Sequence, residues 1–201
     1  MTRWKPLAPR ALWVGDSFTA GEGAQVPAPL TYPHLVSARL GWTCHVDAQN
    51  GTGFVNDGFA ASPECAPLIR RLPDDVRRCA ADVVIVDAGR NDAGTSIPVL
   101  RQAVSEYLTA LRTAYPMARL VLVMPSLVDQ VQPVEYRRAG EVLREASAAC
   151  RAEVIDPAEA GAFEDARRNR GLVCDDGFHP SAAGQAHYAD ALAALLQREP
   201  I

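Results

Sequence analysis

Apolar residues form two kinds of run along this chain, short uninterrupted runs and longer periodic ones. Residues 11–14, 83–86 and 120–124 are apolar without interruption, which is typical of strands buried on both faces of a parallel sheet. Residues 42–48 alternate between apolar and polar positions, and residues 153–156 form a last short run. The pattern therefore predicts five strands.

Between these strands, apolar positions recur at the spacing of an α-helix. The first helical segment ends at Gly41, and a helix is expected to break near Pro73. Thr95 or Ser96 is placed to cap the longest helix. The segments predicted to be helical are residues 32–40, 67–80, 97–115, 137–150 and 181–197.

Strands that alternate with helices usually pair in parallel through right-handed crossovers. The order of elements predicts an α/β fold, a three-layer α/β/α sandwich with a five-stranded parallel sheet in the flavodoxin-like order 2-1-3-4-5. Neither a repeat nor a long linker divides the sequence, so residues 1–201 are expected to form one domain. Ligands of such sheets bind beyond the carboxyl ends of the strands, which is where catalytic residues are expected.

Composition narrows the classes of protein to consider. The net charge of −4 offers no basic patch for nucleic acid. No segment approaches the ~20 apolar residues of a membrane span, so stable membrane association is not expected. The N-terminus has no apolar run that would form a signal peptide, which favours a cytoplasmic location, or a secreted one if a leader was removed.

The five cysteines show no spacing typical of a metal site. We expect reduced thiols, with a bridge between Cys44 and Cys65 as the alternative for an exported protein. Neither a metal nor an organic cofactor is expected.

Two polar motifs follow predicted strands and so belong to the same sheet edge. Gly-Asp-Ser at residues 15–17 offers Ser17 as a hydroxyl nucleophile, although Ser17 or Asp16 could instead cap the following helix. Gly-Arg-Asn-Asp at residues 89–92 follows the strand at 83–86. The amide of Asn91 donates hydrogen bonds and cannot ionise, which suits an oxyanion hole; the alternative is a residue that stabilises its own turn.

Two further motifs complete the set. In Asp-Gly-Phe-His-Pro at residues 176–180, the carboxylate of Asp176 can accept Nδ1–H of His179 and leave Nε2 to face a serine. The alternative is a pair that only shapes a turn. In Asn-Gly-Thr-Gly at residues 50–53, Gly53 offers a backbone N–H that no side chain blocks, or is simply a turn residue.

These four motifs, in this order, resemble those of the SGNH hydrolases, also called the GDSL esterase/lipase family. The resemblance extends from residue 11 to about residue 190. It implies the three-layer sandwich, Ser17 as nucleophile, His179 as general base and Asp176 as the residue that orients the histidine.

The resemblance also assigns an oxyanion hole to the backbone N–H groups of Ser17 and Gly53 and to the side chain of Asn91, with Gly51 as the alternative to Gly53. The sequence departs from the family pattern at two positions. Phe18 replaces a leucine, and Arg90 stands where a small residue is common, so Arg90 is expected to change the rim of the pocket and the charge preference for substrates. The Arg90 side chain is expected either to pair with a carboxylate or to face solvent.

The expected activity is a serine ester hydrolase that acts on a small-molecule ester with a short acyl group, with acetylated carbohydrate among the candidates. Lysophospholipase, thioesterase and acyltransferase activities would use the same residues. A non-catalytic flavodoxin-like binding module is the alternative from another class.

Overall fold

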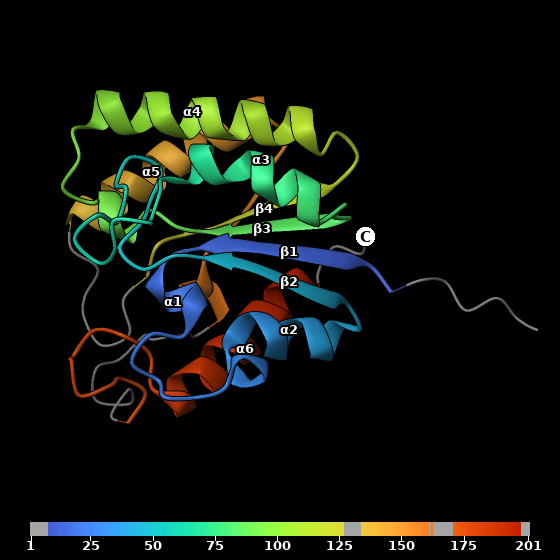
Figure 1. The fold of residues 1–201 in the computed structure, drawn as a ribbon, viewed down its shortest axis with the longest axis vertical. Helices are drawn as coiled ribbons and strands as arrows, with labels where there is room; N and C mark the ends of the chain where they lie inside the picture. The colour runs from blue at the N-terminus through green and yellow to red at the C-terminus, as the bar shows by residue number, and fades with distance from the viewer. Residues whose placement is uncertain (1–7, 127–133, 161, 163–170, 198–201) are drawn as a thin grey trace, which may run out of the picture.

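The computed structural model describes residues 8–126, 134–160, 162 and 171–197, and every structural statement below concerns these residues. A central sheet carries helices on both faces (Figure 1). All its strand pairs are parallel and their order is β2-β1-β3-β4-β5, which confirms the predicted topology. The strands are β1 (Arg10–Gly15), β2 (Thr43–Ala48), β3 (Val83–Asp87), β4 (Arg119–Val123) and β5 (Glu153–Ile155).

Two groups of helices cover the two faces and confirm the three-layer sandwich (Figure 1). One layer contains α3 (Leu68–Arg78), α4 (Ile97–Ala114) and α5 (Val134–Ala149). The other contains α1 (Ser17–Ala20), α2 (Tyr32–Leu40) and α6 (Ala182–Leu196). The 3₁₀ turns are η1 (Ala28–Leu30), η2 (Arg90–Asp92) and η3 (Pro157–Ala160).

Successive residues of a strand face opposite layers, which explains the uninterrupted apolar runs. In β1, Leu12 packs in the core under α3, α4 and α5, whereas Trp13 packs in the core with α2 and α6. The edge strand β2 leaves more of its residues accessible, in agreement with its alternating sequence.

The structure corrects two details of the helix prediction. No break occurs near Pro73, which lies inside α3. Leu68 and Leu72 are buried on one face of this helix, and we attribute its continuity to that packing, which offsets the missing N–H of the proline. Helix α5 begins at Val134, before its apolar face starts, and Ala149 at its end is exposed rather than buried.

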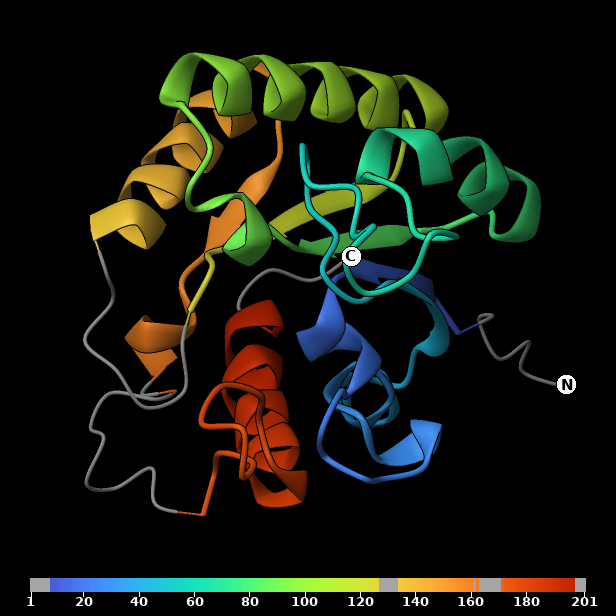
Figure 2. The ribbon, with the colours of Figure 1, turned by 60° about the vertical axis from the view of Figure 1, so that its left-hand side comes forward.

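The carboxyl ends of the strands lie on the left in Figure 1, where α1 begins. Figure 2 shows that α1, η2 and the loop after β2 gather at this edge. All five cysteines are free thiols, so the Cys44–Cys65 alternative is wrong for this structure. Among the described residues, no helix has the length and apolarity needed to cross a bilayer.

Candidate active site

The turn after β1 sets the position of Ser17. A Cβ at Gly15 would lie 1.9 Å from Thr19 Oγ1, so the turn requires glycine there. Asp16 is the N-cap of α1, because its Oδ1 accepts a hydrogen bond from Phe18 N at 2.9 Å. Ser17 is therefore the first residue of the helix and not its cap, which leaves its hydroxyl for another partner.

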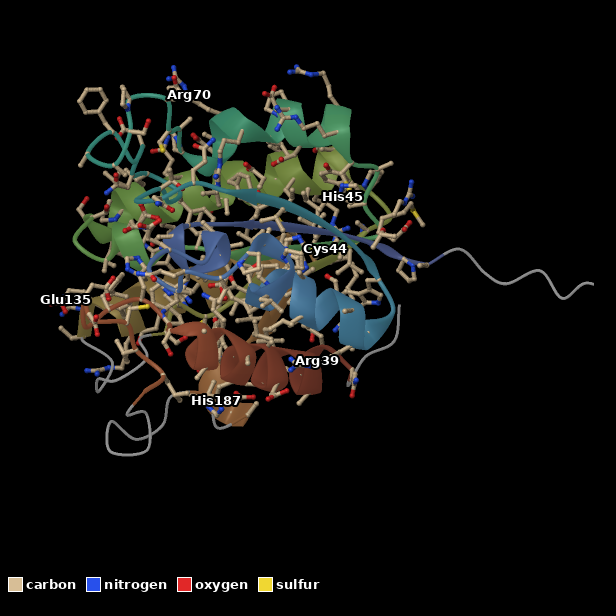
Figure 3. All side chains as sticks on the ribbon, turned by 60° about the horizontal axis from the view of Figure 1, so that its bottom comes forward. Arg39, Cys44, His45, Arg70, Glu135 and His187 are labelled. Atoms are coloured by element: carbon tan, nitrogen blue, oxygen red, sulfur yellow. The ribbon has the colours of Figure 1, made fainter. Side chains whose placement is uncertain are left out.

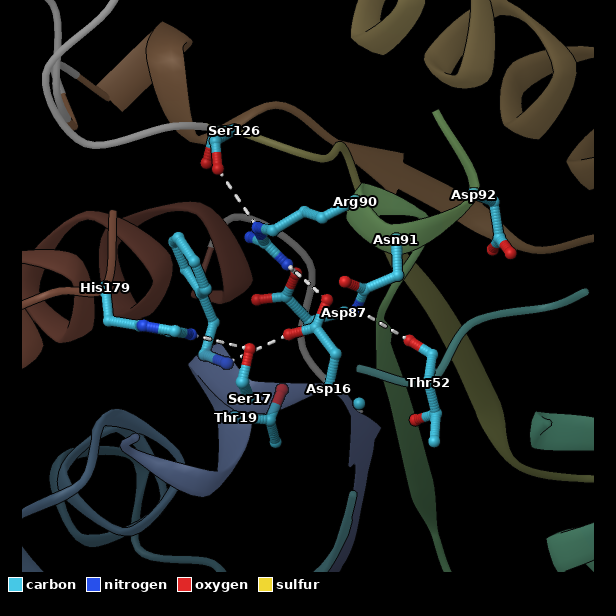
Figure 4. A network of polar contacts seen from close by, with 12 residues as sticks. Asp16, Ser17, Thr19, Thr52, Asp87, Arg90, Asn91, Asp92, Ser126 and His179 are labelled. Atoms are coloured by element: carbon cyan, nitrogen blue, oxygen red, sulfur yellow. Dashed lines mark hydrogen bonds and ion pairs between the residues drawn. The ribbon is translucent and has the colours of Figure 1, made fainter. Parts of the chain in front are cut away.

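Ser17, His179 and Asp176 form a continuous chain of hydrogen bonds, of which Figure 4 shows the link between Ser17 and His179. His179 Nε2 lies 2.9 Å from Ser17 Oγ, although the two residues are 162 positions apart in sequence. His179 Nδ1 lies 2.6 Å from Asp176 Oδ2. The geometry matches that of a nucleophile, a base and an orienting carboxylate.

The loop that carries His179 is held by hydrogen bonds from its own backbone N–H groups to Asp176. Asp176 Oδ1 accepts hydrogen bonds from the N–H groups of Phe178 at 2.8 Å and His179 at 3.0 Å. Gly177 adopts a φ of +70°, which favours glycine, and Ser181 caps α6 directly after the loop. The loop therefore presents the imidazole in one orientation.

Asp176 has the electrostatics of an ionised partner for histidine. Burial acts to raise its pKa, but hydrogen bonds from the His179 ring and from two backbone N–H groups outweigh burial and lower the pKa below its usual value. Asp176 is thus a carboxylate at neutral pH. Such a carboxylate stabilises an imidazolium formed when His179 takes a proton.

Two hydrogen-bond donors lie at the same edge, on separate turns. Asn91, in η2, donates one Nδ2 hydrogen to Thr52 O at 2.9 Å, which fixes the amide and leaves its second hydrogen. The N–H of Ser17 is the first of helix α1, and it has no acceptor among the described residues. Both groups are suited to a developing negative oxygen.

The backbone N–H of Gly53 differs from expectation. It donates to Asn56 O at 2.9 Å and closes a tight turn, so in this structure it is not free for an oxyanion. A Cβ at Gly53 would lie 2.2 Å from Asp92 Oδ2. The glycine is required because the carboxylate packs against it. Gly51, the alternative, turns the chain with a φ of +72°.

Asp92 organises the loop after β2 rather than its own turn. Its carboxylate accepts hydrogen bonds from the backbone N–H groups of Phe54 at 2.7 Å, Val55 at 3.1 Å and Asn56 at 2.9 Å. This contact ties the segment at 53–56 to the turn that carries Asn91. The sequence pattern did not indicate that contact, because it spans more than 35 positions.

Arg90 is 3% exposed, so the expectation that it forms the rim of the pocket is wrong. Its guanidinium lies 2.6 Å from Asp87 and 3.5 Å from Asp16, both fully buried (Figure 4). Burial acts to lower the pKa of Arg90, but the two carboxylates raise it well above its ordinary value. Burial raises the pKa of Asp16 to about 6, against the opposing effect of Arg90.

The remaining histidines lie outside this cluster. His34 Nδ1 lies 3.0 Å from Thr31 Oγ1, and His45 pairs with Leu12 within the sheet. Figure 3 shows His45 and His187 on different parts of the molecule. Within the described ranges, no group of His, Cys, Asp and Glu side chains is arranged to hold a metal ion.

A hollow of about 410 Å³ lies at the loop after β2, and neither Ser17 nor His179 is among its lining residues. Gln49 lines it and donates its backbone N–H to Gly15 O at 3.2 Å. Asn50, also in its wall, donates to Glu22 Oε2 at 2.6 Å, and Glu22 N donates to Ser17 O. The residues that line the hollow are Ala48, Gln49, Asn50, Ala61, Ser62, Glu64 and Cys65.

Known proteins share this sequence pattern and this fold. The chain is 26% identical over 195 residues to GDSL lipase Rv0518 of Mycobacterium tuberculosis (strain ATCC 25618 / H37Rv), covering 92% of this chain and 80% of the relative.

Two solved structures share the fold. A carbohydrate esterase family 2 enzyme from Corynascus thermopiles (Myceliophthora fergusii) has a TM-score of 0.72 at 22% identity, covering 96% of this chain and 68% of that one. The psychrotrophic esterase EstA from Pseudoalteromonas sp., inhibited by monoethylphosphonate, has a TM-score of 0.72 at 16% identity, covering 94% and 97%.

The sequence also matches the GDSL-like Lipase/Acylhydrolase family over residues 13–187, which includes all four polar motifs. This match covers most of the chain and agrees with an ester-hydrolase type of site on a three-layer fold. The chain belongs to the GDSL-like lipase/acylhydrolase family and is a carboxylic ester hydrolase of the SGNH type.

Proposed function

We propose that this protein hydrolyses small or short-chain acyl esters with Ser17 as nucleophile, His179 as general base and Asp176 as the orienting carboxylate. The observation that carries the proposal is the hydrogen-bond chain from Ser17 Oγ through both ring nitrogens of His179 to Asp176, at 2.9 Å and 2.6 Å. A serine hydroxyl is a weak nucleophile unless a base within hydrogen-bond reach takes its proton.

The reaction has two halves. His179 takes the Ser17 proton as Oγ attacks the ester carbonyl, and the resulting imidazolium is stabilised by Asp176. His179 then protonates the leaving alcohol, and an acyl-enzyme remains. Water attacks the acyl group by the same steps in the second half, which regenerates Ser17.

The tetrahedral oxyanion is held by the N–H of Ser17 and the second Nδ2 hydrogen of Asn91. These donors come from the starts of α1 and η2, two turns joined by the buried contact of Asp16 with Arg90. The N–H of Gly53 joins them only if its hydrogen bond to Asn56 O opens when substrate binds.

The hollow at the loop after β2 offers polar groups to a small substrate. Its wall carries the amides of Gln49 and Asn50 and the carboxylate of Glu64, which are able to hydrogen-bond to hydroxyl groups. The fold shared with a carbohydrate esterase is in keeping with an acetylated carbohydrate as substrate.

Hydrolysis of a panel of p-nitrophenyl esters of rising chain length, alongside acetylated sugars, tests the proposal. The parent should cleave acetyl esters, and its kcat/KM should fall as the acyl chain lengthens. Ser17→Ala should be inactive on every ester. Ser105→Ala, which changes an exposed serine on α4, should behave like the parent. Equal activity of Ser17→Ala and the parent would rule the proposal out.

A further inference from the structure

The guanidinium of Arg90 joins four separate segments beneath the candidate active site. Nε donates to Ser126 O at 3.0 Å and Nη2 donates to Tyr188 Oη at 3.3 Å. Nη1 donates to Asp87 Oδ1 at 2.6 Å and to Asp16 Oδ2 at 3.5 Å. Of these partners, Ser126 follows β4, Tyr188 lies on α6, Asp87 ends β3 and Asp16 follows β1.

Asp16 extends this contact to the nucleophile turn. One carboxylate oxygen caps α1 by accepting from Phe18 N, and the other faces Arg90. The side chain that sets the start of the Ser17 helix is thus held from below by Arg90.

The ring of Phe18 forms a second connection. Its centroid lies 4.1 Å from Arg90 Cζ, a cation–π contact. The same ring packs edge-on against Phe178 with centroids 5.3 Å apart and lies 5.7 Å from the imidazole of His179. Arg90 therefore also supports the surface on which the base rests.

Asp16 and Arg90 are each the direct sequence neighbour of a residue with a proposed role in the reaction. Asp16 directly precedes Ser17, and Arg90 directly precedes Asn91. Their buried ion pair joins the two turns that carry the nucleophile and the oxyanion donor. A shift of either side chain moves the backbone of the functional residue next to it.

We propose that Arg90 is a positioning residue that holds the Ser17 turn and the Asn91 turn at a fixed separation, so that attack and oxyanion stabilisation occur in one geometry. This inference rests on the proposed roles of Ser17 and Asn91. It assigns to Arg90 a role in the chemical step and not in substrate charge selection, since a buried guanidinium does not contact substrate.

The planar fork of arginine predicts that lysine does not replace Arg90. Arg90 donates in three directions at once, to a backbone carbonyl, a tyrosine and two carboxylates. A lysine ammonium keeps the charge but is a single point on a flexible stem. Arg90→Lys therefore removes the fixed geometry while it keeps the buried charge balance with Asp16 and Asp87.

Steady-state kinetics on p-nitrophenyl acetate test this role in Arg90→Lys. A misplacement of about 1 Å in an active site can cost ~10²-fold in rate, so kcat should fall about 10- to 100-fold with KM changed less than about threefold. The matched control is Arg112→Lys. Arg112 donates to the backbone carbonyls of Cys150, Ala118 and Arg151, away from the candidate site, and its replacement should lower the melting temperature but leave kcat unchanged.

A double-mutant cycle separates positioning from general stability. If Arg90 acts through the oxyanion donor, Arg90→Lys should lower kcat less in an Asn91→Ala background than in the parent. Normal kcat in folded Arg90→Lys, or a full multiplicative loss in the double variant, would overturn the proposal.

A variant that removes both charges of the Asp16–Arg90 pair, Asp16→Asn with Arg90→Gln, serves if Arg90→Lys does not fold, as judged by circular dichroism. Parent-like kcat in this folded pair would also overturn the proposal.

Ser17→Ala distinguishes a failure of the proposed function from a failure of the proposed role of Arg90. Activity retained there refutes the proposed function, whereas an inactive Ser17→Ala beside a fully active Arg90→Lys refutes only the role of Arg90.

Discussion

The proton-transfer side and the oxyanion side of the candidate site are built in different ways. His179 and Asp176 lie in one short loop, and a single long-range contact, to Ser17, completes that side. The candidate donors for the oxyanion, at Ser17 and Asn91, lie on separate turns, and the N–H of Gly53, in a third loop, is already bonded to Asn56 O. The first side depends on local geometry, and the second depends on how distant loops are joined.

This difference also appears in the hydrogen bonds. On the proton-transfer side each bond leads from one functional group to the next. On the oxyanion side Asn91 donates one of its two hydrogens to Thr52 O and Gly53 donates its N–H to Asn56 O, whereas the Ser17 N–H has no acceptor among the described residues. We infer that the first side is ready for reaction in the free protein and that on the second side the Gly53 N–H is limited by a competing acceptor.

The largest effect should come from removing either end of the proton relay. Ser17→Ala and His179→Ala should each lower kcat by roughly 10⁴–10⁶ while the fold is kept, because the nucleophile and its base act as a unit. Ester hydrolysis with circular dichroism as the folding check measures this. Nearly equal losses in the two single variants and the double variant are expected, and additive losses would contradict a shared step.

Asp176→Asn should have the next largest effect, about 10²–10⁴ in kcat. The amide keeps the size of the side chain but no longer stabilises an imidazolium. The neighbouring Asp175→Asn is the matched control, because Asp175 is exposed and one position away. A parent-like pH–rate profile in Asp176→Asn would show that Asp176 has no part in the relay.

On the oxyanion side, Asn91→Ala should lower kcat by about 10²–10³, close to the cost of losing one donor in other oxyanion holes. Its KM should change little, since the donor acts mainly in the transition state. Gln102→Ala, which removes an amide on the surface of α4, is the control. A loss smaller than about threefold would exclude Asn91 as a donor.

The two sides were not equally predictable from the sequence. The strands and their order followed from the apolar runs, and the Asp-x-x-His loop followed from local spacing. The hydrogen bond that occupies the Gly53 N–H could not be predicted from the sequence, because Asp92 shapes that turn from a distant position. Burial of Arg90 was also missed, since its partners Asp16, Ser126 and Tyr188 come from three segments that meet only in the fold. A charged residue at the end of a buried strand, Asp87, was the one available signal.

Amide NMR gives a smaller but sharper test of the competing acceptors. When a phosphonate occupies the site, the Ser17 N–H resonance should move strongly downfield, because this group gains an acceptor. The Gly53 N–H resonance should move little, because it already donates to Asn56 O. A large shift of the Gly53 resonance would mean that its turn opens and that Gly53 is a third donor.

The smallest expected effect is a difference in how the two sides respond to pH. The pKa of Asp176 is lowered on folding, so its contribution to stability is present above its unfolded pKa and is lost as pH falls through the folded value. The pKa of Asp16 is raised to about 6, so its contribution is present at low pH and is lost as pH rises through about 6.

Urea unfolding of the parent and of Asp16→Asn at pH 5 and pH 7.5 measures the second contribution. The free energy of unfolding of the parent should exceed that of the variant by roughly 1–1.5 kcal/mol more at pH 5 than at pH 7.5. This is the difference that the linkage relation gives for the raised pKa of Asp16. A constant difference between parent and variant at the two pH values would contradict a raised pKa for Asp16.

Reaction of the intact protein with a fluorophosphonate probe tests the central claim most directly, since only an activated hydroxyl beside an oxyanion hole reacts rapidly. Mass spectrometry of the digested protein should find one adduct, on the peptide that contains Ser17, and labelling should be absent in Ser17→Ala and much slower in His179→Ala. An adduct on another residue, or equal labelling of the parent and Ser17→Ala, would contradict the proposed nucleophile.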